Sequence, residues 1–365
     1  MTGRIVLLGA TGYTGNLVLE AVTARGLSPV LAGRNAGALA ELARPRGLEH
    51  VVVDVTDPEG LRHLLRPGDV LVTTVGPFER FGDSVAAAAV EAGAHYIDST
   101  GEVGFVRGLQ QRLHGRAVET GSVVVPAFGY DYVPGILAGA LAAEQGGDDV
   151  HALDIGYFAT GPLWRGLSQG TRTTMRDGLT LPSARWLGHR LVEERTAGRV
   201  RAFEVGGRRR NAFLVSGTEV LFLPDTVPRL DSVTVYNGWF PALSRATSVV
   251  SALAAAAIRR PGGRKVVDVL TKPVAGPPGG PGADQRTRTR THVVAVAAAA
   301  AGGPPLAEVH VEGPSIYTLT GALIAWAAEQ LARGAGRSPG VIGPINVFGL
   351  ELLRAGCAEV GLAPI

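Results

Sequence analysis

The first fifteen residues contain the feature that most limits how this chain can fold. An uninterrupted aliphatic run at Ile5–Leu8 is followed by three glycines, Gly9, Gly12 and Gly15. Buried parallel strands are built from such runs, and residues 16–24 carry apolar side chains at helical spacing. The segment therefore predicts a strand, a tight turn and a helix whose first N–H groups face the phosphates of a dinucleotide.

Each of these glycines has its own predicted role in the turn. Gly9 permits the sharp turn off the strand, Gly12 lets the backbone approach a pyrophosphate, and Gly15 lets the helix lie close to the strand. A glycine turn without a ligand is the alternative, and the strand and helix on either side make it the weaker interpretation.

Alternating strands and helices continue to about residue 145 and then stop. A chain of 365 residues also exceeds one ordinary core, so we expect two domains. The predicted α/β dinucleotide-binding domain covers residues 1–130, and a helix in 335–365 packs back on it. Residues 131–334 form the second domain, an α+β substrate domain with a mainly antiparallel sheet.

The second domain is expected to contain several strands and one flexible connection. The strands are predicted at residues 151–158, 199–240, 266–271 and 287–296, with a hairpin at Gly206-Gly207. Near the last strand Arg286, Arg288 and Arg290 alternate with threonines, and strand geometry would put all three on one face. Residues 273–284 are mostly Gly and Pro, which is typical of a flexible connection.

The rare residue types exclude several kinds of site. Cys357 is the single cysteine, which excludes an internal disulfide and a multi-cysteine metal site, and none of the eight histidines has metal-ligand spacing. The only lysines are Lys265 and Lys272. Neither follows a tyrosine by four residues, so the Tyr-x-x-x-Lys mechanism of short-chain reductases is excluded. The arginines are scattered rather than interleaved with aromatics, so we expect no nucleic-acid partner.

The start of the chain and its apolar runs predict a cytoplasmic protein. The first strand begins too close to Met1 for a signal peptide. The apolar runs near 251–258 and 293–301 are shorter than the roughly 20 residues that span a bilayer. We therefore expect no membrane span.

Arg34, two residues after the end of the second predicted strand, 29–32, distinguishes the two nicotinamide cofactors. NAD-specific sites hold an Asp or Glu there for the ribose 2′-OH, whereas this chain has Arg34. An arginine offers a planar fork to a 2′-phosphate, so we predict NADPH; the alternative is that Arg34 only faces solvent. The residues predicted to bind the cofactor are Gly9, Thr11, Gly12, Tyr13, Thr14, Gly15, Gly33, Arg34, Asn35, Asp54, Val75, Gly76, Pro77, Phe78, Ser99, Gly101 and Gly129.

Loops 76–78, 98–102 and 129–134 each follow a predicted strand, and the carboxyl ends of parallel strands share one edge of a sheet. We predict the active site at this edge. A nicotinamide reductase supplies a proton to the bond that takes the hydride. Without a nearby lysine, the catalytic candidates are Tyr130, Asp131 and Asp98, with Tyr130 first; the alternative for Tyr130 is an aromatic that packs in the hinge between the domains.

The acidic residues at this edge each have two interpretations. Asp98 and Glu102 could form a carboxylate pair with one raised pKa, or Glu102 could cap the helix that begins near residue 104. Asp131 could orient a substrate or the nicotinamide ribose, or stabilise the helix start near Pro134. The candidate substrate contacts are Glu102 and Tyr132, with Arg172 and Tyr317 from the second domain.

Six segments together resemble one protein family. They are the glycine loop 9–15, Ala32–Arg34, Gly76–Phe78, Tyr96–Glu102, Gly129–Pro134 and Gly340–Pro344. As an ordered set they are similar to the saccharopine dehydrogenase-like NADP-binding reductases, in particular the branch that includes trans-acting enoyl reductases. The resemblance implies a Rossmann domain, an inserted substrate domain whose sheet mediates homodimer contacts, NADPH, and reduction of a C=C or C=N bond.

The favoured function is reduction of the C=C bond of an unsaturated acyl or polyketide-type intermediate in secondary metabolism. The substrate is expected to be a small molecule or bound to a carrier protein, and an acidic carrier could meet the arginine-rich segments 199–210 and 286–290. An imine reductase of the saccharopine-reductase type and a non-catalytic NADP-binding redox sensor are the alternatives.

Overall fold

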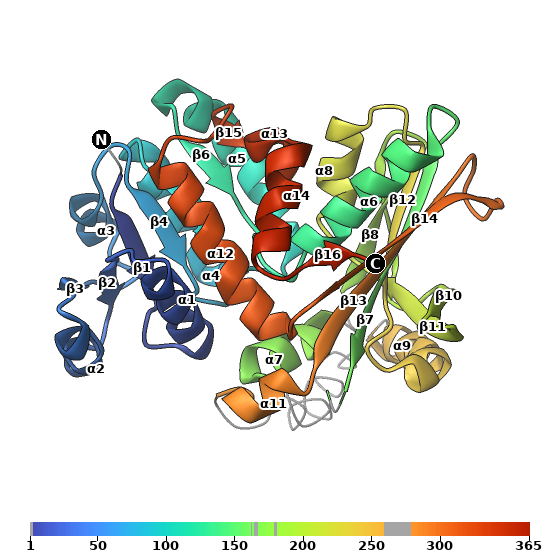
Figure 1. Cartoon of the computed structure of the whole chain (residues 1–365), viewed down its shortest axis with the longest axis horizontal. Helices are drawn as coiled ribbons and strands as arrows, with labels where there is room; N and C mark the ends of the chain where they lie inside the picture. The colour runs from blue at the N-terminus through green and yellow to red at the C-terminus, as the bar shows by residue number, and fades with distance from the viewer. Residues whose placement is uncertain (1–2, 162, 164–166, 179–180, 259–278) are drawn as a thin grey trace. The chain divides into compact units, whose positions relative to one another are not determined.

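The polypeptide divides into two units, which are described separately. The computed structural model describes residues 3–161, 163, 167–178, 181–258 and 279–365 (Figure 1). Unit 1 comprises Met1–Val133 and Ile316–Gly361, and unit 2 comprises Pro134–Ser315 and Leu362–Ile365. The predicted boundaries were 130/131 and 334/335, so the second differs by the length of one helix.

Unit 1 is built on a seven-stranded sheet in the order β15-β6-β5-β4-β1-β2-β3 (Figure 1). The strands are β1 (Ile5–Leu8), β2 (Val30–Gly33), β3 (His50–Val52), β4 (Val70–Thr73), β5 (His95–Asp98), β6 (Val123–Val125) and β15 (Gly340–Val341). Every pairing in it is parallel. The strand order reverses between β1 and β4, which is where doubly wound sheets bind their ligands. The predicted Rossmann architecture is confirmed.

The helices of unit 1 follow local sequence signals. They are α1 (Tyr13–Ala24), α2 (Ala36–Ala43), α3 (Pro58–Leu64), α4 (Phe78–Glu91), α5 (Val103–Thr120), α12 (Ile316–Ala332), α13 (Pro344–Phe348) and α14 (Leu350–Glu359). At α3 the Asp57 carboxylate accepts the Gly60 N–H at 3.0 Å, and Pro58 is the first helical residue. This start of α3 agrees with the sequence signals for a helix N-terminus.

Helix α12 belongs to unit 1, whereas the sequence pattern placed it in the second domain. It packs on α1 and on strands β1, β4 and β5. Its residues are mostly apolar and buried on all sides. A helix that is apolar all round has no single stripe that indicates its partner, so its sequence does not assign it to either domain.

Unit 2 is built on a nine-stranded, mainly antiparallel sheet, which confirms the predicted architecture. Its main path is β10-β11-β12-β7-β13-β14-β16, and the β8–β9 hairpin is attached to β12. The strands are β7 (Ala152–Thr160), β8 (Pro182–Leu187), β9 (Leu191–Arg195), β10 (Val200–Val205), β11 (Arg208–Val215), β12 (Ser232–Asn237), β13 (Arg290–Ala298), β14 (Pro305–Gly313) and β16 (Ala363–Pro364). The helices are α6 (Val133–Gly146), α7 (Gln169–Gly178), α8 (Glu219–Thr226), α9 (Ser244–Ile258) and α11 (Ala283–Thr287).

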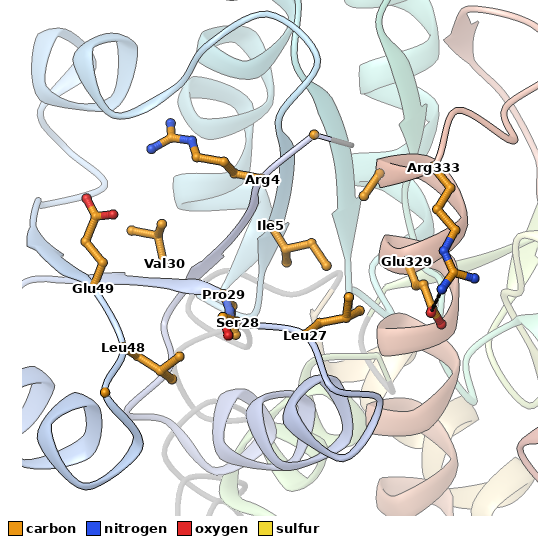
Figure 2. Close-up of a pocket in the computed structure, with 13 residues that line it drawn as sticks. Arg4, Ile5, Leu27, Ser28, Pro29, Val30, Leu48, Glu49, Glu329 and Arg333 are labelled. Atoms are coloured by element: carbon orange, nitrogen blue, oxygen red, sulfur yellow. Dashed lines mark ion pairs between the residues drawn. The ribbon is translucent and has the colours of Figure 1, made fainter. Parts of the chain in front are cut away.

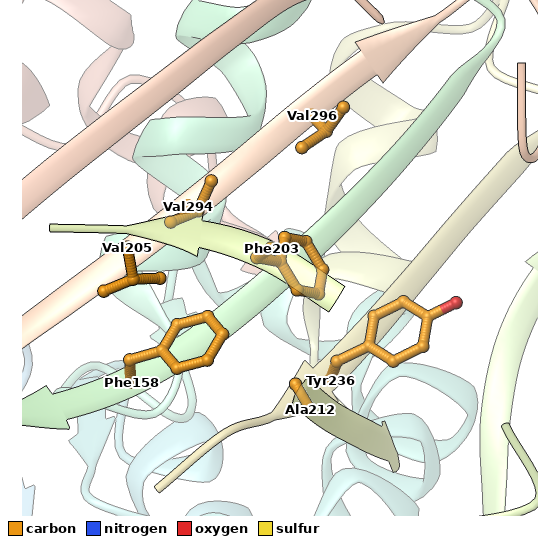
Figure 3. Packing of buried hydrophobic residues seen from close by; sticks show 7 residues of the cluster. All are labelled: Phe158, Phe203, Val205, Ala212, Tyr236, Val294 and Val296. Carbon is orange, nitrogen blue, oxygen red and sulfur yellow. The ribbon is translucent and has the colours of Figure 1, made fainter. Parts of the chain in front are cut away.

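The hairpin of β10 and β11 contributes side chains to the core of unit 2 (Figure 3). Gly206 and Gly207 connect the two strands with φ angles of +58° and +69°, which glycine adopts readily in a two-residue turn. The predicted hairpin is therefore confirmed. Phe203 of β10 packs edge-to-face on Phe158 of β7 with ring centroids 5.7 Å apart, and Val294 of β13 belongs to the same cluster.

Two expectations for unit 2 were wrong. Arg286 lies in helix α11, Arg288 is the C-terminal cap of that helix, and Arg290 begins β13, so the three arginines do not share a strand face. Gly282 is the N-cap of α11, and its N–H donates to the Gln285 side chain; this local helix start prevails over the alternation. The region predicted as strands at 199–240 also contains helix α8. The strand predicted at 266–271 and part of the connection at 273–284 lie outside the described residues.

Candidate active site

The glycine loop after β1 is closely packed at two of its three glycines. Gly9 has a φ of +89°, and a Cβ there would lie 2.7 Å from Val75 Cγ2. A Cβ on Gly15 would lie 2.1 Å from the Gly9 carbonyl oxygen. Larger residues would therefore clash with the end of β4 at the first position and with the turn at the other. The lack of room for a Cβ at Gly9 and at Gly15 agrees with the predicted roles of these two glycines.

Gly12 and Thr11 lie on the exposed side of the same turn. Gly12 is the N-cap of α1 and has no side chain to satisfy the first N–H groups of the helix. A Cβ on Gly12 would meet one atom within 4 Å, the Gly9 oxygen at 3.3 Å. The backbone at Gly12 is therefore open to solvent next to the first N–H groups of α1, those of Thr14 and Gly15. This open backbone fits the approach of a pyrophosphate.

The end of β2 presents Arg34 to solvent directly after Gly33. The Asn35 side chain accepts the Ala38 N–H at 3.0 Å and so caps α2. The Asp54 carboxylate accepts both the hydroxyl and the N–H of Thr56, and these bonds lower its pKa. An exposed cation beside the glycine loop fits the 2′-phosphate of NADPH. The contact between Asp54 and adenine stays a prediction.

Glu102 links the loop after β5 to the helix after β4. Its two oxygens accept the N–H groups of Phe78 and Glu79 at 3.0 and 2.8 Å, so it caps α4. Pro77, the N-cap residue of α4, has no polar side chain that could do this. The predicted cap on α5 was wrong, because parallel strands bring the end of β5 next to the start of the neighbouring helix.

Asp98 joins the loops that follow β5 and β6. Its buried carboxylate accepts hydrogen bonds from the Tyr96 hydroxyl at 2.8 Å, the Thr100 N–H at 2.9 Å and the Ala127 N–H at 2.8 Å. Burial raises the pKa of Asp98 to about 6 against these bonds, and the charge of Glu102 raises it further. The Asp98 carboxylate thus positions two loops, and its direct part in a reaction stays a prediction.

The loop after β6 carries the other two catalytic candidates. The Tyr132 hydroxyl donates to the Gly101 carbonyl oxygen at 2.8 Å, which ties this loop to the one after β5. The Tyr130 N–H donates to the Thr320 hydroxyl at 3.1 Å, and the Tyr130 side chain is buried. Burial raises the pKa of Asp131 to about 7. The three loops that were predicted to share one edge are therefore hydrogen-bonded to one another.

Two positioning residues were missed by the sequence reasoning. Tyr96 and Asp98 are two apart in a strand, so alternation alone places them on one face. Thr320 of α12 packs against the loop after β6, because a Cβ on Gly129 would lie 2.9 Å from its Cγ2. Nothing in the local sequence indicates this second contact.

The remaining candidates lie in different units. Tyr317 lies in unit 1 rather than in the second domain, and its ring packs edge-to-face on Tyr13 of α1 with centroids 5.3 Å apart. Arg172 lies on α7 in unit 2 and donates to the Leu167 carbonyl oxygen at 2.6 Å. Among the described residues, no group of three His, Cys, Asp or Glu side chains could hold a metal ion.

A separate pocket of about 450 Å³ lies at the amino ends of β1 and β2 (Figure 2). Two ion pairs involve its lining residues: Arg4 pairs with Asp69 at 2.6 Å, and Glu329 pairs with Arg333 at 2.6 Å. Open α/β sheets bind ligands at the opposite, carboxyl ends of their strands. The pocket is therefore distinct from the glycine loop and its neighbouring loops.

Residues 5–125 match the family model described as the saccharopine dehydrogenase NADP binding domain. The chain is 31% identical over 202 residues to a trans-acting enoyl reductase of Mycobacterium ulcerans, covering 52% of this chain and 48% of that protein. It is 35% identical over 157 residues to a probable mitochondrial saccharopine dehydrogenase-like oxidoreductase of Arabidopsis thaliana, covering 39% and 35%. It is 32% identical over 190 residues to a lipid droplet localized protein of Caenorhabditis elegans, covering 48% and 45%. The matches thus span less than half the length of these relatives.

The fold as a whole is similar to that of a solved saccharopine dehydrogenase. The apo, histidine-tagged, L-Glu-forming enzyme of Saccharomyces cerevisiae superposes with a TM-score of 0.67 at 12% identity, covering 100% of this chain and 99% of that one. At this identity the likeness shows a shared fold. It extends over both units, whereas the family model covers part of the first.

Proposed function

We infer that this chain, which carries the NADP-binding domain of the saccharopine dehydrogenase family at residues 5–125, is an NADPH-dependent reductase. The proposed reaction is reduction of a C=C bond in an unsaturated acyl or polyketide-type intermediate. One observation carries the proposal: three hydrogen-bonded loops lie at the carboxyl edge of the sheet that also holds the glycine loop, and one of them includes a carboxyl group, Asp131, whose pKa is raised to about 7.

The loops support a division of the chemistry between cofactor and protein. NADPH, when bound, supplies the hydride. The protein supplies the proton, and near neutral pH a carboxyl group with a pKa of about 7 is partly protonated and can donate it. Tyr130, the first candidate from the sequence, is placed second as a proposed donor. The bonds of Asp98, Glu102 and Tyr132 keep the loops in place, so that little reorganisation is needed during the reaction.

The names of relatives support C=C reduction over the alternatives. The Mycobacterium relative is named an enoyl reductase, whereas the structural likeness to saccharopine dehydrogenase supports the imine reductase as the second candidate. The test is NADPH oxidation by the full chain with a panel of enoyl thioesters and a panel of cyclic imines. Oxidation with thioesters alone supports the proposal, and oxidation with imines alone replaces it with the second candidate. Tight NADPH binding without oxidation by either panel favours a redox sensor.

We extend the proposal to the partner and the setting of the reaction. Arg208, Arg209 and Arg210 are consecutive residues at the start of β11; the first two are exposed, and they are the proposed contacts for an acidic carrier protein. A homodimer and a cytoplasmic location are part of the same proposal. Light scattering of the purified chain tests the first, and fractionation of the source cells tests the second.

A further inference from the structure

Helix α9 of unit 2 has its polar and apolar sides reversed relative to an ordinary surface helix. The Ser244 hydroxyl donates to the Asn211 carbonyl oxygen at 3.0 Å, and the Ser251 hydroxyl donates to the Thr196 carbonyl oxygen at 2.5 Å. These two serines are the buried residues of the helix. A surface helix normally buries its apolar stripe and exposes its polar one, so the side of α9 that packs on the protein is the polar side.

The opposite side of α9 is apolar and exposed. Leu253 is 66% exposed, Val249 60% and Val250 55%. The other exposed residues at 242–256 are Ala242, Leu243, Arg245, Ala246, Ala252 and Ala256. Arg245 is therefore the single charged residue on this face within 242–256. A contiguous apolar face of this kind marks an interaction surface.

Charge in the surrounding sequence distinguishes between occupants of this face. Between Asp231 and Asp268 the sequence has no acidic residue, and it has five basic ones, whereas the whole chain has 35 basic and 32 acidic residues. Four of the five, Arg259, Arg260, Arg264 and Lys265, lie outside the described residues, and Arg245 is on the exposed face itself. An apolar helix face that carries a cation and no acidic residue complements an anionic lipid surface. A protein partner of equal chemistry would need an apolar, acidic patch of its own.

We propose that the exposed face of α9 and of the turn before it, residues 242–256, docks this protein on an anionic lipid surface. The segment Pro241–Ile258 is long and apolar enough to cross a membrane, by length and composition alone. Its serine bonds to the sheet, and the bond from Arg195 to the Ser248 carbonyl oxygen at 2.9 Å, hold α9 flat on unit 2. The helix therefore lies in the lipid interface and leaves the fold of unit 2 intact.

The test is sedimentation of the full chain with lipid vesicles. Wild type is expected to bind phosphatidylcholine–phosphatidylglycerol vesicles about tenfold more tightly than phosphatidylcholine vesicles, with binding that weakens as salt is added. A triple variant, Val249→Ser, Val250→Ser and Leu253→Ser, is expected to lose at least about tenfold of this binding. Arg245→Glu lowers binding to the anionic vesicles alone.

The matched control replaces exposed apolar residues elsewhere. Val118 on α5 and Leu306 on β14 are 47% and 45% exposed, and a Val118→Ser, Leu306→Ser variant should bind vesicles like wild type. Circular dichroism and the thermal midpoint check that each variant is folded, and Arg245→Glu provides a second test if the triple variant is not. No vesicle binding by wild type overturns the proposal. So does a wild-type dimer that the triple variant converts to a monomer, because a second copy would then cover the face.

Discussion

The glycine loop offers a test in which stability and cofactor binding separate. In Gly15→Ala the new Cβ would lie 2.1 Å from the Gly9 oxygen, whereas ordinary contact begins at 3.4 Å. Helix α1 must therefore move from β1 by more than ~1 Å, and overpacking of this kind costs about 1–3 kcal/mol of unfolding free energy. The same movement takes the N–H groups away from the phosphates, so we expect NADPH affinity to fall about tenfold or more, or ~1.4 kcal/mol.

Gly12→Ala is the informative companion to this variant. Its Cβ would contact the Gly9 oxygen at 3.3 Å and face solvent otherwise, so the stability should change little. The methyl group would stand where the pyrophosphate approaches, so NADPH affinity should still fall. The control is Gly115→Ala in α5, where a Cβ meets nothing within 4 Å; it should raise stability by about 1 kcal/mol and leave binding unchanged.

Thermal or urea unfolding measures the stability of these variants, and isothermal titration with NADPH measures their affinity. If Gly15→Ala unfolds like wild type, the close approach of α1 to β1 is not the reason for that glycine. If Gly12→Ala keeps its affinity, the pyrophosphate does not lie over the turn.

Four further outcomes follow from the site. Arg34→Asp should lower NADPH affinity by about 10- to 100-fold and leave NADH affinity equal or better, since the 2′-phosphate loses its cation; equal loss for both cofactors would contradict the assignment. If Asp131 is the donor, kcat/KM should fall as the pH rises through about 7, because the proton leaves the group, and Asp131→Asn should remove that inflection. The pKa of Asp98 is about 6 in the folded chain, against an ordinary 3.8. The folded chain therefore holds this proton more tightly than the unfolded chain does, and the unfolding free energy of wild type should fall as the pH rises from 3.8 to about 6. Asp98→Asn, compared by urea titration, should lack that fall. Charge reversal at Arg208–Arg210 should slow turnover of a carrier-tethered substrate and spare a free thioester, and equal kinetics with both would exclude the carrier surface.

The sequence predicted best where neighbouring residues determine the structure. The run Ile5–Leu8 and the glycines after it define β1, the turn and the start of α1 within a few residues of each other. Asp57 and Pro58 likewise signal the start of α3 locally. Strand ends in a parallel sheet then share an edge by geometry, so the grouping of three loops at one edge could also be predicted.

The sequence could not predict contacts that depend on which elements become neighbours. Glu102 caps α4, a helix that begins earlier in the chain, because β4 and β5 pair in parallel. Thr320 reaches the loop at Gly129 only after α12 has packed on unit 1. The exposed side of α9 could not be predicted for a related reason. Its apolar residues resemble those of a core helix, and the hydrogen bonds of Ser244 and Ser251 are what show which side faces the protein.

The discontinuity of unit 1 has a consequence for the order in which the chain folds during synthesis. Residues 134–315 leave the ribosome as one stretch and contain every strand of unit 2 except β16. Unit 1, although begun first, still lacks α12 and β15 at that point, so the face of its sheet at β1, β4 and β5 is uncovered. Exposed apolar surface of this kind is prone to aggregation and is what chaperones bind. A chain stopped before Ile316 therefore has a complete glycine loop but lacks α12, the helix that packs on α1 and on strands β1, β4 and β5.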